Sequence, residues 1–158
     1  MKKYEFTGET KRVELWNRTA TLHRIKATVE FGFVKVGELG GWIEKEENLS
    51  HEGKAWVCGD AKVCGDAKVC GDAKVCGDAE VFLASHVLVM GSVGSRNDFT
   101  TFFRDKDNEI TVKCGCFLGK IDKFLEKVTQ THGNNKYALV YRAAVEVAKL
   151  QIELTERK

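Results

Sequence analysis

The chain has 158 residues, 43% of them hydrophobic, and its 25 lysines and arginines nearly balance 23 aspartates and glutamates. Near neutrality gives no global field that would draw the protein to nucleic acid, so the composition argues against such a partner. No apolar run approaches the roughly 20 residues that span a bilayer, and the start of the chain lacks the apolar stretch of a signal peptide. We therefore expect a cytoplasmic protein with reduced thiols and no membrane partner.

Residues 1–32 predict an N-terminal β-hairpin. Apolar residues alternate at Val13 and Leu15 before a turn and resume at Leu22 and Ile25 after it. We expect this hairpin to cap the open end of the segment that follows, because an uncovered strand edge recruits other strands. Its basic residues are interpreted as a solvated face rather than a binding patch.

Residues 55–78 contain four nearly identical six-residue units, AWVCGD followed by three copies of AKVCGD. In an extended strand the Ala and Val of a unit point to one side, which predicts a core, while the Lys and Cys point to the other. The Gly-Asp pair supplies a residue that adopts positive φ readily and a polar partner for nearby backbone, so the chain can turn after each short strand. Stacked units would enclose a thin Val/Ala column, as in a parallel β-helix.

The unit resembles the hexapeptide repeat of left-handed β-helices, in which three six-residue sides make one coil of about 18 residues. The resemblance implies a mainly β protein with a short left-handed parallel β-helix over residues 33–93, in which residue n lies beneath residue n+18. Phe82 and Leu88 replace outward cysteines near the end of the repeat. Exposed apolar groups mark contact sites, so Phe82 and Leu88 suit a subunit contact or a contact with the next segment of the chain. We expect them to form the subunit interface of a homotrimer.

The spacing of the cysteines argues against both a metal site and a disulfide. The four repeat cysteines fall on successive sides of the coil, so only Cys58 and Cys76 become neighbours, which cannot assemble a tetrahedral thiolate site. Cys114 and Cys116 lie two apart in a strand, too far apart for easy bridging. We interpret all six as structural residues, and we expect neither a metal nor a cofactor.

Residues 94–158 predict a C-terminal α+β module. FTTFFR, a polar DKDNE turn and ITVKCGCF form a second hairpin, followed by two helices. The first helix is expected over 122–131, ending at Gly133, and the second begins at an Asn cap, Asn134 or Asn135, and runs to about residue 154.

Motifs outside the repeat make the family resemblance more specific. FGFVKVGELGGWIEKEENLSHEG before the repeats and GSRNDFTTFFR, CGCF and THGNN after them are similar to a family of hexapeptide-repeat proteins encoded by bacteriophages, prophages and bacteria. In that family the outward cysteine is often a tyrosine. The resemblance covers nearly the whole chain and implies phage-type provenance and fold, but it brings no catalytic residues.

The polar residues at the junction between repeat and module are the candidate ligand site. Clefts tend to form where two parts of a chain meet, and arginine forks with hydroxyl donors bind anions. The competing interpretation is structural, with an Arg96–Asp98 salt bridge and side chains that only cap turns. The candidate ligand-binding residues are Ser95, Arg96, Asn97, Thr100, Thr101, Arg104, His132 and Asn134.

Two functions follow from these observations. The first is a non-enzymatic, phage-type binding or scaffold protein that inhibits a bacterial defence system by engaging a host protein or by sequestering a small anionic, nucleotide-like ligand. The second is a reduced hexapeptide-type acyltransferase, in which His86 would be the general base. A lone outward histidine is more often a surface residue, so we assign no catalytic residue.

Overall fold

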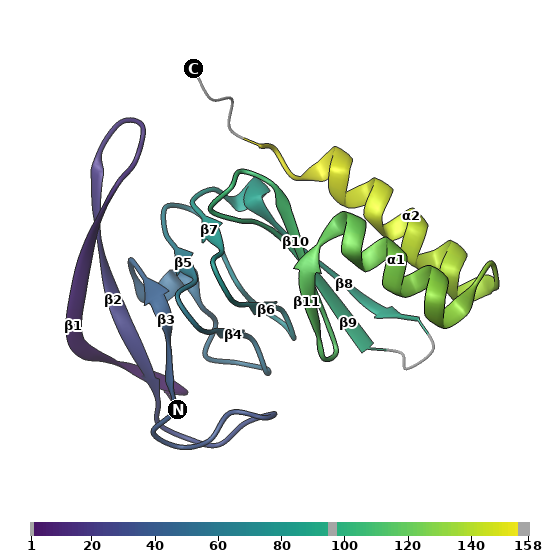
Figure 1. Cartoon of the computed structure of the whole chain (residues 1–158). Helices are drawn as coiled ribbons and strands as arrows, with labels where there is room; N and C mark the ends of the chain where they lie inside the picture. Colours follow the sequence, from purple (N-terminus) through teal and green to yellow (C-terminus); the bar gives the residue numbers. More distant parts are fainter. Residues whose placement is uncertain (1, 95–97, 155–158) are drawn as a thin grey trace.

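The computed structural model describes residues 2–94 and 98–154. Figure 1 shows the hairpin of β1 and β2 at one end, the repeats in the middle and helices α1 and α2 at the other end. The strands are β1 (Tyr4–Glu14), β2 (Thr19–Ala27), β3 (Leu39–Ile43), β4 (Trp56–Val57), β5 (Lys62–Val63), β6 (Lys74–Val75), β7 (Glu80–Val81), β8 (Val87–Val93), β9 (Asp98–Arg104), β10 (Ile110–Cys114) and β11 (Phe117–Lys120). The helices are two short 3-10 helices, η1 (Glu46–Asn48) and η2 (Ala84–His86), and the α-helices α1 (Ile121–His132) and α2 (Lys136–Gln151).

The expected left-handed parallel β-helix is wrong. The described strands sort into a mixed five-stranded sheet ordered β1-β2-β3-β5-β7, an antiparallel sheet ordered β11-β10-β9-β8 and a two-stranded sheet of β4 and β6. Where the repeats form strands, these have only two residues, and the unit at residues 67–72 contributes only an isolated bridge between Val69 and Leu49. The remaining residues of each unit form its turn. The longer flanking strands pair antiparallel, so they rather than the repeats decide the sheet pattern.

The inward assignment of Ala and Val in the repeat is confirmed. The five valines from Val57 to Val81 and the alanines between them are at most 1% exposed, in one cluster that also takes in Ile43 and Leu49. The predicted 18-residue offset is also present, because Trp56 pairs with Lys74 and β5 pairs with β7 in parallel.

The glycines of the repeat make the corners that the sequence predicts. Gly65 has a φ of +65°, and a Cβ there would lie 2.5 Å from the carbonyl oxygen of Phe82. At this position both the backbone conformation and the close approach of the next layer require glycine.

Cys58 and Cys76 form a disulfide, which corrects the expectation of reduced thiols. Their Cα atoms are 4.6 Å apart across one 18-residue offset, within the range that a disulfide needs. The sequence placed these two residues next to each other, but the inference that they stay unbonded is wrong.

Cys64 is a free thiol, and its burial together with the nearby Glu44 carboxylate raises its pKa to about 12, so it is inert.

The N-terminal hairpin joins the repeats edge to edge. β2 pairs antiparallel with β3, and β3 pairs in parallel with β5, so the hairpin covers the open edge of the repeat sheet. Under the hairpin, Leu22, Trp42, Cys64 and Phe82 form a second small core. Residues that the repeat pattern places outward are therefore covered here by the hairpin.

A bidentate ion pair fastens the hairpin turn to the repeats. The two terminal nitrogens of Arg18 donate to the carboxylate of Glu44 at 2.6 and 2.9 Å, and the same carboxylate accepts the N–H of Gly65 at 2.9 Å. The hydrogen bonds from Arg18 lower the pKa of Glu44 to about 2. The pair therefore favours the ionised carboxylate in the folded state.

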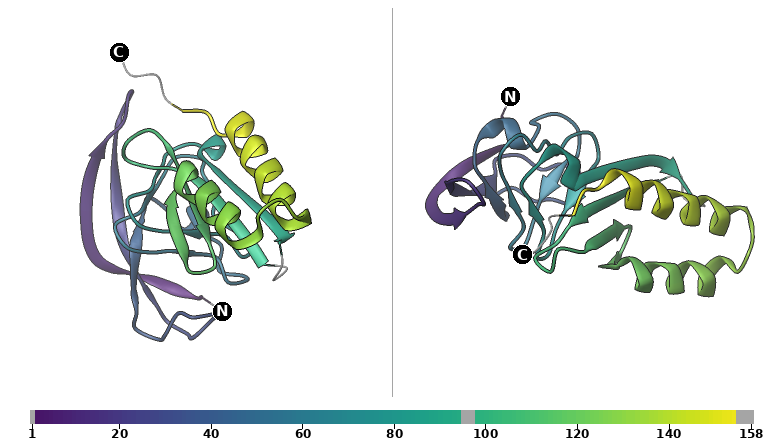
Figure 2. Two further views of the ribbon diagram at one scale, coloured as in Figure 1. Left: turned by 45° about the vertical axis from the view of Figure 1, so that its right-hand side comes forward. Right: turned by 90° about the horizontal axis from the view of Figure 1, so that it is seen from above.

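In the C-terminal module, both α-helices pack on the antiparallel sheet. α1 lies on β10 and β11, α2 lies on β8, and Figure 2 shows the two helices running side by side. Phe102 and Val112 of the sheet meet Phe124, Tyr141 and Val145 of the helices in the core between them. The Asn135 side chain caps α2 by accepting the N–H of Ala138 at 3.1 Å, as its position before the helix predicts.

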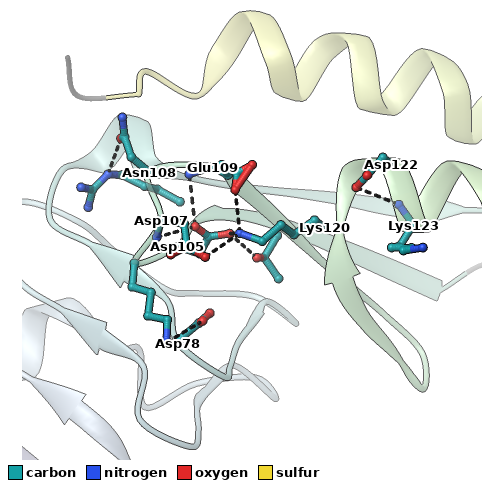
Figure 3. Close-up of polar contacts among 11 residues, drawn as sticks. Asp78, Asp105, Asp107, Asn108, Glu109, Lys120, Asp122 and Lys123 are labelled. Atoms are coloured by element: carbon teal, nitrogen blue, oxygen red, sulfur yellow. Dashed lines mark hydrogen bonds and ion pairs between the residues drawn. The ribbon is translucent and has the colours of Figure 1, made fainter. Parts of the chain in front are cut away.

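The polar DKDNE turn contains a carboxylate cluster closed by one lysine. The ammonium of Lys120 lies 3.1 Å from Asp105, 2.9 Å from Asp107 and 3.0 Å from Glu109, as Figure 3 shows. Burial alone would lower the pKa of Lys120, but hydrogen bonds to the three carboxylates outweigh it and raise the pKa. The turn also pairs with the repeat, because the N–H of Lys106 donates to the Asp78 carbonyl.

Within residues 2–94 and 98–154, no helix combines the length and the apolar character that crossing a membrane requires.

Replacing Val69 with Asp should unfold the protein. Val69 is 1% exposed in the Val/Ala column, and an unpaired carboxylate there costs several kcal/mol, comparable with the total stability of about 5–15 kcal/mol of a domain. Thermal melts followed by circular dichroism measure whether the variant still unfolds cooperatively and at which temperature. Lys68→Asp, at the exposed neighbouring position, is the matched control, and a normal melt of Val69→Asp would contradict the inward assignment.

Replacing Glu44 with Gln should lower the melting temperature in a pH-dependent way. The folded pKa of about 2 lies below the ordinary glutamate value of 4.5, so the ion pair stabilises fully above pH 4.5 and loses this effect as the pH falls toward 2. The difference in Tm between wild type and E44Q should therefore be largest at pH 7. It should shrink toward zero as the pH falls from 4.5 to 2. Glu5→Gln, which removes an exposed pair 3.6 Å long with Lys26, should show no such difference.

Candidate functional site

A pocket of about 240 Å³ opens where the repeats meet the antiparallel sheet. Its walls come from the turn after β2, from the repeats, from β9 and from the end of β10. We call it the lysine pocket. It is lined by Gly32, Phe33, Lys54, Asp72, Lys74, Asp98, Phe99, Thr101, Lys113 and Gly115.

Three lysines from separate segments converge on the lysine pocket. Among the described residues, none of Lys54, Lys74 and Lys113 forms an ion pair with a carboxylate. The Lys113 ammonium donates to the carbonyl of Gly115, and the Lys74 ammonium lies 5.3 Å from the centre of the Phe33 ring. The pocket therefore gathers positive charge that the described part of the chain does not neutralise by direct pairing.

The walls of the pocket are held together by a backbone contact. The N–H of Lys74 donates to the hydroxyl oxygen of Thr101 at 3.0 Å, and Thr101 is 2% exposed on β9. This bond joins a repeat strand to the C-terminal sheet at the base of the pocket. The backbone of Lys74 in the repeat is thereby held against β9 of the C-terminal sheet.

The predicted site residues on and before β9 separate into three groups. Ser95, Arg96 and Asn97 lie outside the described residues. Both threonines are buried, but Thr101 lines the lysine pocket, whereas Thr100 donates its hydroxyl to the Cys114 sulfur at 3.3 Å. Of the two predicted threonines, only Thr101 lines the pocket.

Arg104 does not line the lysine pocket. It lies instead where β9 meets the repeats. Its Nε donates to Asn108 at 3.0 Å and its Nη1 donates to the Glu80 carbonyl at 2.9 Å. The guanidinium also lies 5.4 Å from the centre of the Phe82 ring. Arg104 is 8% exposed, so its role is to hold β9 against the repeats.

His132 and Asn134 lie at the connection between α1 and α2 and do not line the lysine pocket. The His132 ring is stacked 5.9 Å from the ring of Tyr141, and Asn134 accepts a hydrogen bond from Arg142 at 3.1 Å. A Cβ on Gly94 would lie 1.8 Å from the Tyr141 hydroxyl, so Tyr141 separates His132 from the end of β8.

The sequence interpretation missed the lysines and the aromatic residue Phe33. Lys74 stands at the outward position of its repeat, which was a usable signal, but nothing in the local sequence brings it near Lys113, 39 positions later. That proximity depends on how β6 and β9 meet. Among the described residues, no group of three or more His, Cys, Asp or Glu side chains is arranged to hold a metal.

The predicted interface residues find their contacts within the chain. Phe82 is 7% exposed beneath the hairpin, and Leu88 packs against the core of the C-terminal module. Phe82 therefore offers little surface to a second subunit, whereas Leu88 is half-buried. Exposed apolar side chains lie instead on α2, where Leu139 is 60%, Val147 45% and Leu150 88% exposed.

His86 is buried rather than presented to a substrate. Its side chain is 0% exposed, and its Nδ1 accepts the N–H groups of Phe82 and Leu83 at 3.0 and 3.2 Å. Burial, with a smaller contribution from the positive charge of Arg104, lowers its pKa to about 4. The ring is therefore neutral at pH 7 and accepts backbone N–H groups of the turn at η2, in the wall of a second pocket that Trp16 and Leu83 also line.

His86 should titrate at a much lower pH than an ordinary histidine. Because the folded pKa of about 4 lies below the ordinary histidine value of 6.5, the contribution of the neutral ring to stability is complete above pH 6.5 and falls as the pH drops toward 4. An NMR titration of the ring protons should give a midpoint below pH 5, and His86→Asn should weaken the fall in Tm across this window. A midpoint near 6.5 would show that the ring is solvated.

Comparisons with known proteins do not assign this chain to a family. No family model matches it, and no curated protein is similar to it in sequence. The geometry of the lysine pocket is therefore the main evidence for function.

Proposed function

We propose that the protein is a non-enzymatic binding protein that holds a small phosphorylated ligand in the lysine pocket. One observation carries this proposal: three lysines, none paired with a carboxylate among the described residues, converge from three segments on one pocket. Lysine is a common phosphate binder and acts as a point charge with three donors.

Charge in the pocket favours an anion. Its lining contains three lysines and two aspartates, Asp72 and Asp98. A phosphate monoester carries about −1.5 to −2 charge at pH 7 and presents three acceptor oxygens. Such a group can pair with two or three of the ammonium groups at once, and this pairing compensates for the loss of their hydration.

The chemistry of the lining supports binding over catalysis. No histidine, cysteine or serine is among the described residues that line the pocket. The acyltransferase alternative needs substrate to reach His86, whose side chain is fully buried. Because the motifs resemble those of phage-encoded proteins, we propose that the protein sequesters a phosphorylated ligand of the host and so inhibits a defence system.

A host protein is the second candidate partner. The exposed leucines and valine on the outer face of α2, described above, favour it, because apolar side chains of this size contribute to protein interfaces. An assembly of several copies would use the same surface in place of Phe82 and Leu88.

Replacing Lys74 or Lys54 with Ala should weaken binding of a phosphorylated probe. We expect isothermal titration with pyrophosphate to show a loss of about 10-fold or more for each variant, since hydrogen bonds to charged groups contribute about 1.5–3 kcal/mol. The melting temperature should be nearly unchanged, because neither ammonium makes an ion pair within the described part of the chain.

Lys123→Ala is the matched control, since Lys123 is an exposed lysine on α1 outside the pocket. It should bind pyrophosphate like the wild type. Failure of the folded wild type to bind, or an equal loss in all three variants, would contradict the proposed function.

A further inference from the structure

We infer that the lysine pocket selects nucleotides over simple phosphates, with the aromatic base stacked on Phe33 and the phosphate held by the lysines. This inference rests on the proposed binding function and adds the class of ligand. An exposed aromatic side chain that lines the pocket is carried on a tight turn of the backbone.

Phe33 is the most exposed large apolar residue of the described chain, at 89% exposed. It is presented by a tight turn, in which Phe31 and Val34 exchange backbone hydrogen bonds of 3.1 and 2.8 Å. Gly32 adopts a φ of +52° within this turn. So exposed a ring buries little of its surface against its own chain, and an open aromatic face at a pocket is suited to a flat partner.

The same ring stands beside a positive charge. The Lys74 ammonium is 5.3 Å from the ring centre, a distance at which the two attract each other. A nucleotide needs this pair of features, because its base stacks on an aromatic face and its phosphate binds cations. Inorganic phosphate or pyrophosphate would use only the ammonium groups.

A second aromatic ring and two acceptors complete the lining. Phe99 is 36% exposed, and a Cβ on Gly91 would lie 2.3 Å from its ring, so glycine at that position makes room for the ring. Asp98 uses one oxygen to accept the N–H of Phe99 at 2.8 Å. The other oxygen, and the carboxylate of Asp72, can accept from exocyclic amines or ribose hydroxyls.

The size of the pocket limits what it encloses. About 240 Å³ is below the roughly 300–1,000 Å³ of pockets that enclose a whole drug-sized ligand. We therefore expect the pocket to hold a base and one phosphate, with any further part of the ligand left in solvent.

The test is isothermal titration of the full chain with AMP, adenosine and pyrophosphate as probes. The wild type should bind AMP more tightly than either adenosine or pyrophosphate. Phe33→Leu, which keeps an apolar side chain but removes the ring, should weaken AMP binding about 10-fold and leave pyrophosphate binding unchanged, as expected for loss of one base stack. Val36→Ala, at an exposed position three residues away that does not line the pocket, should bind all probes like the wild type.

The outcomes separate this inference from the proposed function. If pyrophosphate binds and Lys74→Ala weakens it, but AMP binds no more tightly and Phe33→Leu has no effect, the nucleotide inference is wrong and the proposed function stands. If Phe33→Leu weakens pyrophosphate as much as AMP, the effect is not stacking and the inference is also overturned. If no probe binds to the folded wild type, both are overturned.

Discussion

The Ala and Val side chains of the repeat form a thin apolar column on which the other parts of the fold are built. Each repeat strand has two residues, too short to bury its apolar side alone, and gains its stability from the layer above and below. The backbone hydrogen bonds between layers and the burial of the column are therefore mutually dependent. This dependence explains why the spacing of the repeats is so regular and why glycine occupies their corners.

The column has two ends, and the chain covers each with a different structure. The hairpin of β1 and β2 pairs with β3 at one end, while β9 and its turn contact the last repeats at the other. Each structure covers a strand edge of the repeats, which would otherwise pair with other chains. Covering the second edge also creates the junction where Lys74 meets Thr101, so the lysine pocket is a consequence of how the column ends.

Polar groups at the junctions have different roles according to their burial and partners. Arg104 and Asp105 are buried and fully engaged with groups of the chain, so they serve structure. Lys54 and Lys74 are more accessible and have no carboxylate partner in the described chain, which suits them to a ligand. Residue type alone would have favoured the arginine, whereas the contacts favour the lysines.

The sequence by itself determined the features that depend on neighbouring residues. These were the inward Ala and Val, the corner glycines, the hairpin and an asparagine cap of α2, because periodicity and turn chemistry are local properties. The 18-residue offset was implied by the resemblance to hexapeptide repeats. Only the tertiary structure decided the sheet pattern, the disulfide between Cys58 and Cys76, the burial of His86 and Phe82, and the meeting of Phe33, Lys74 and Lys113. Those features depend on which surfaces pack together across long stretches of chain, and a repeat with identical outward positions does not show which of them its neighbours will cover.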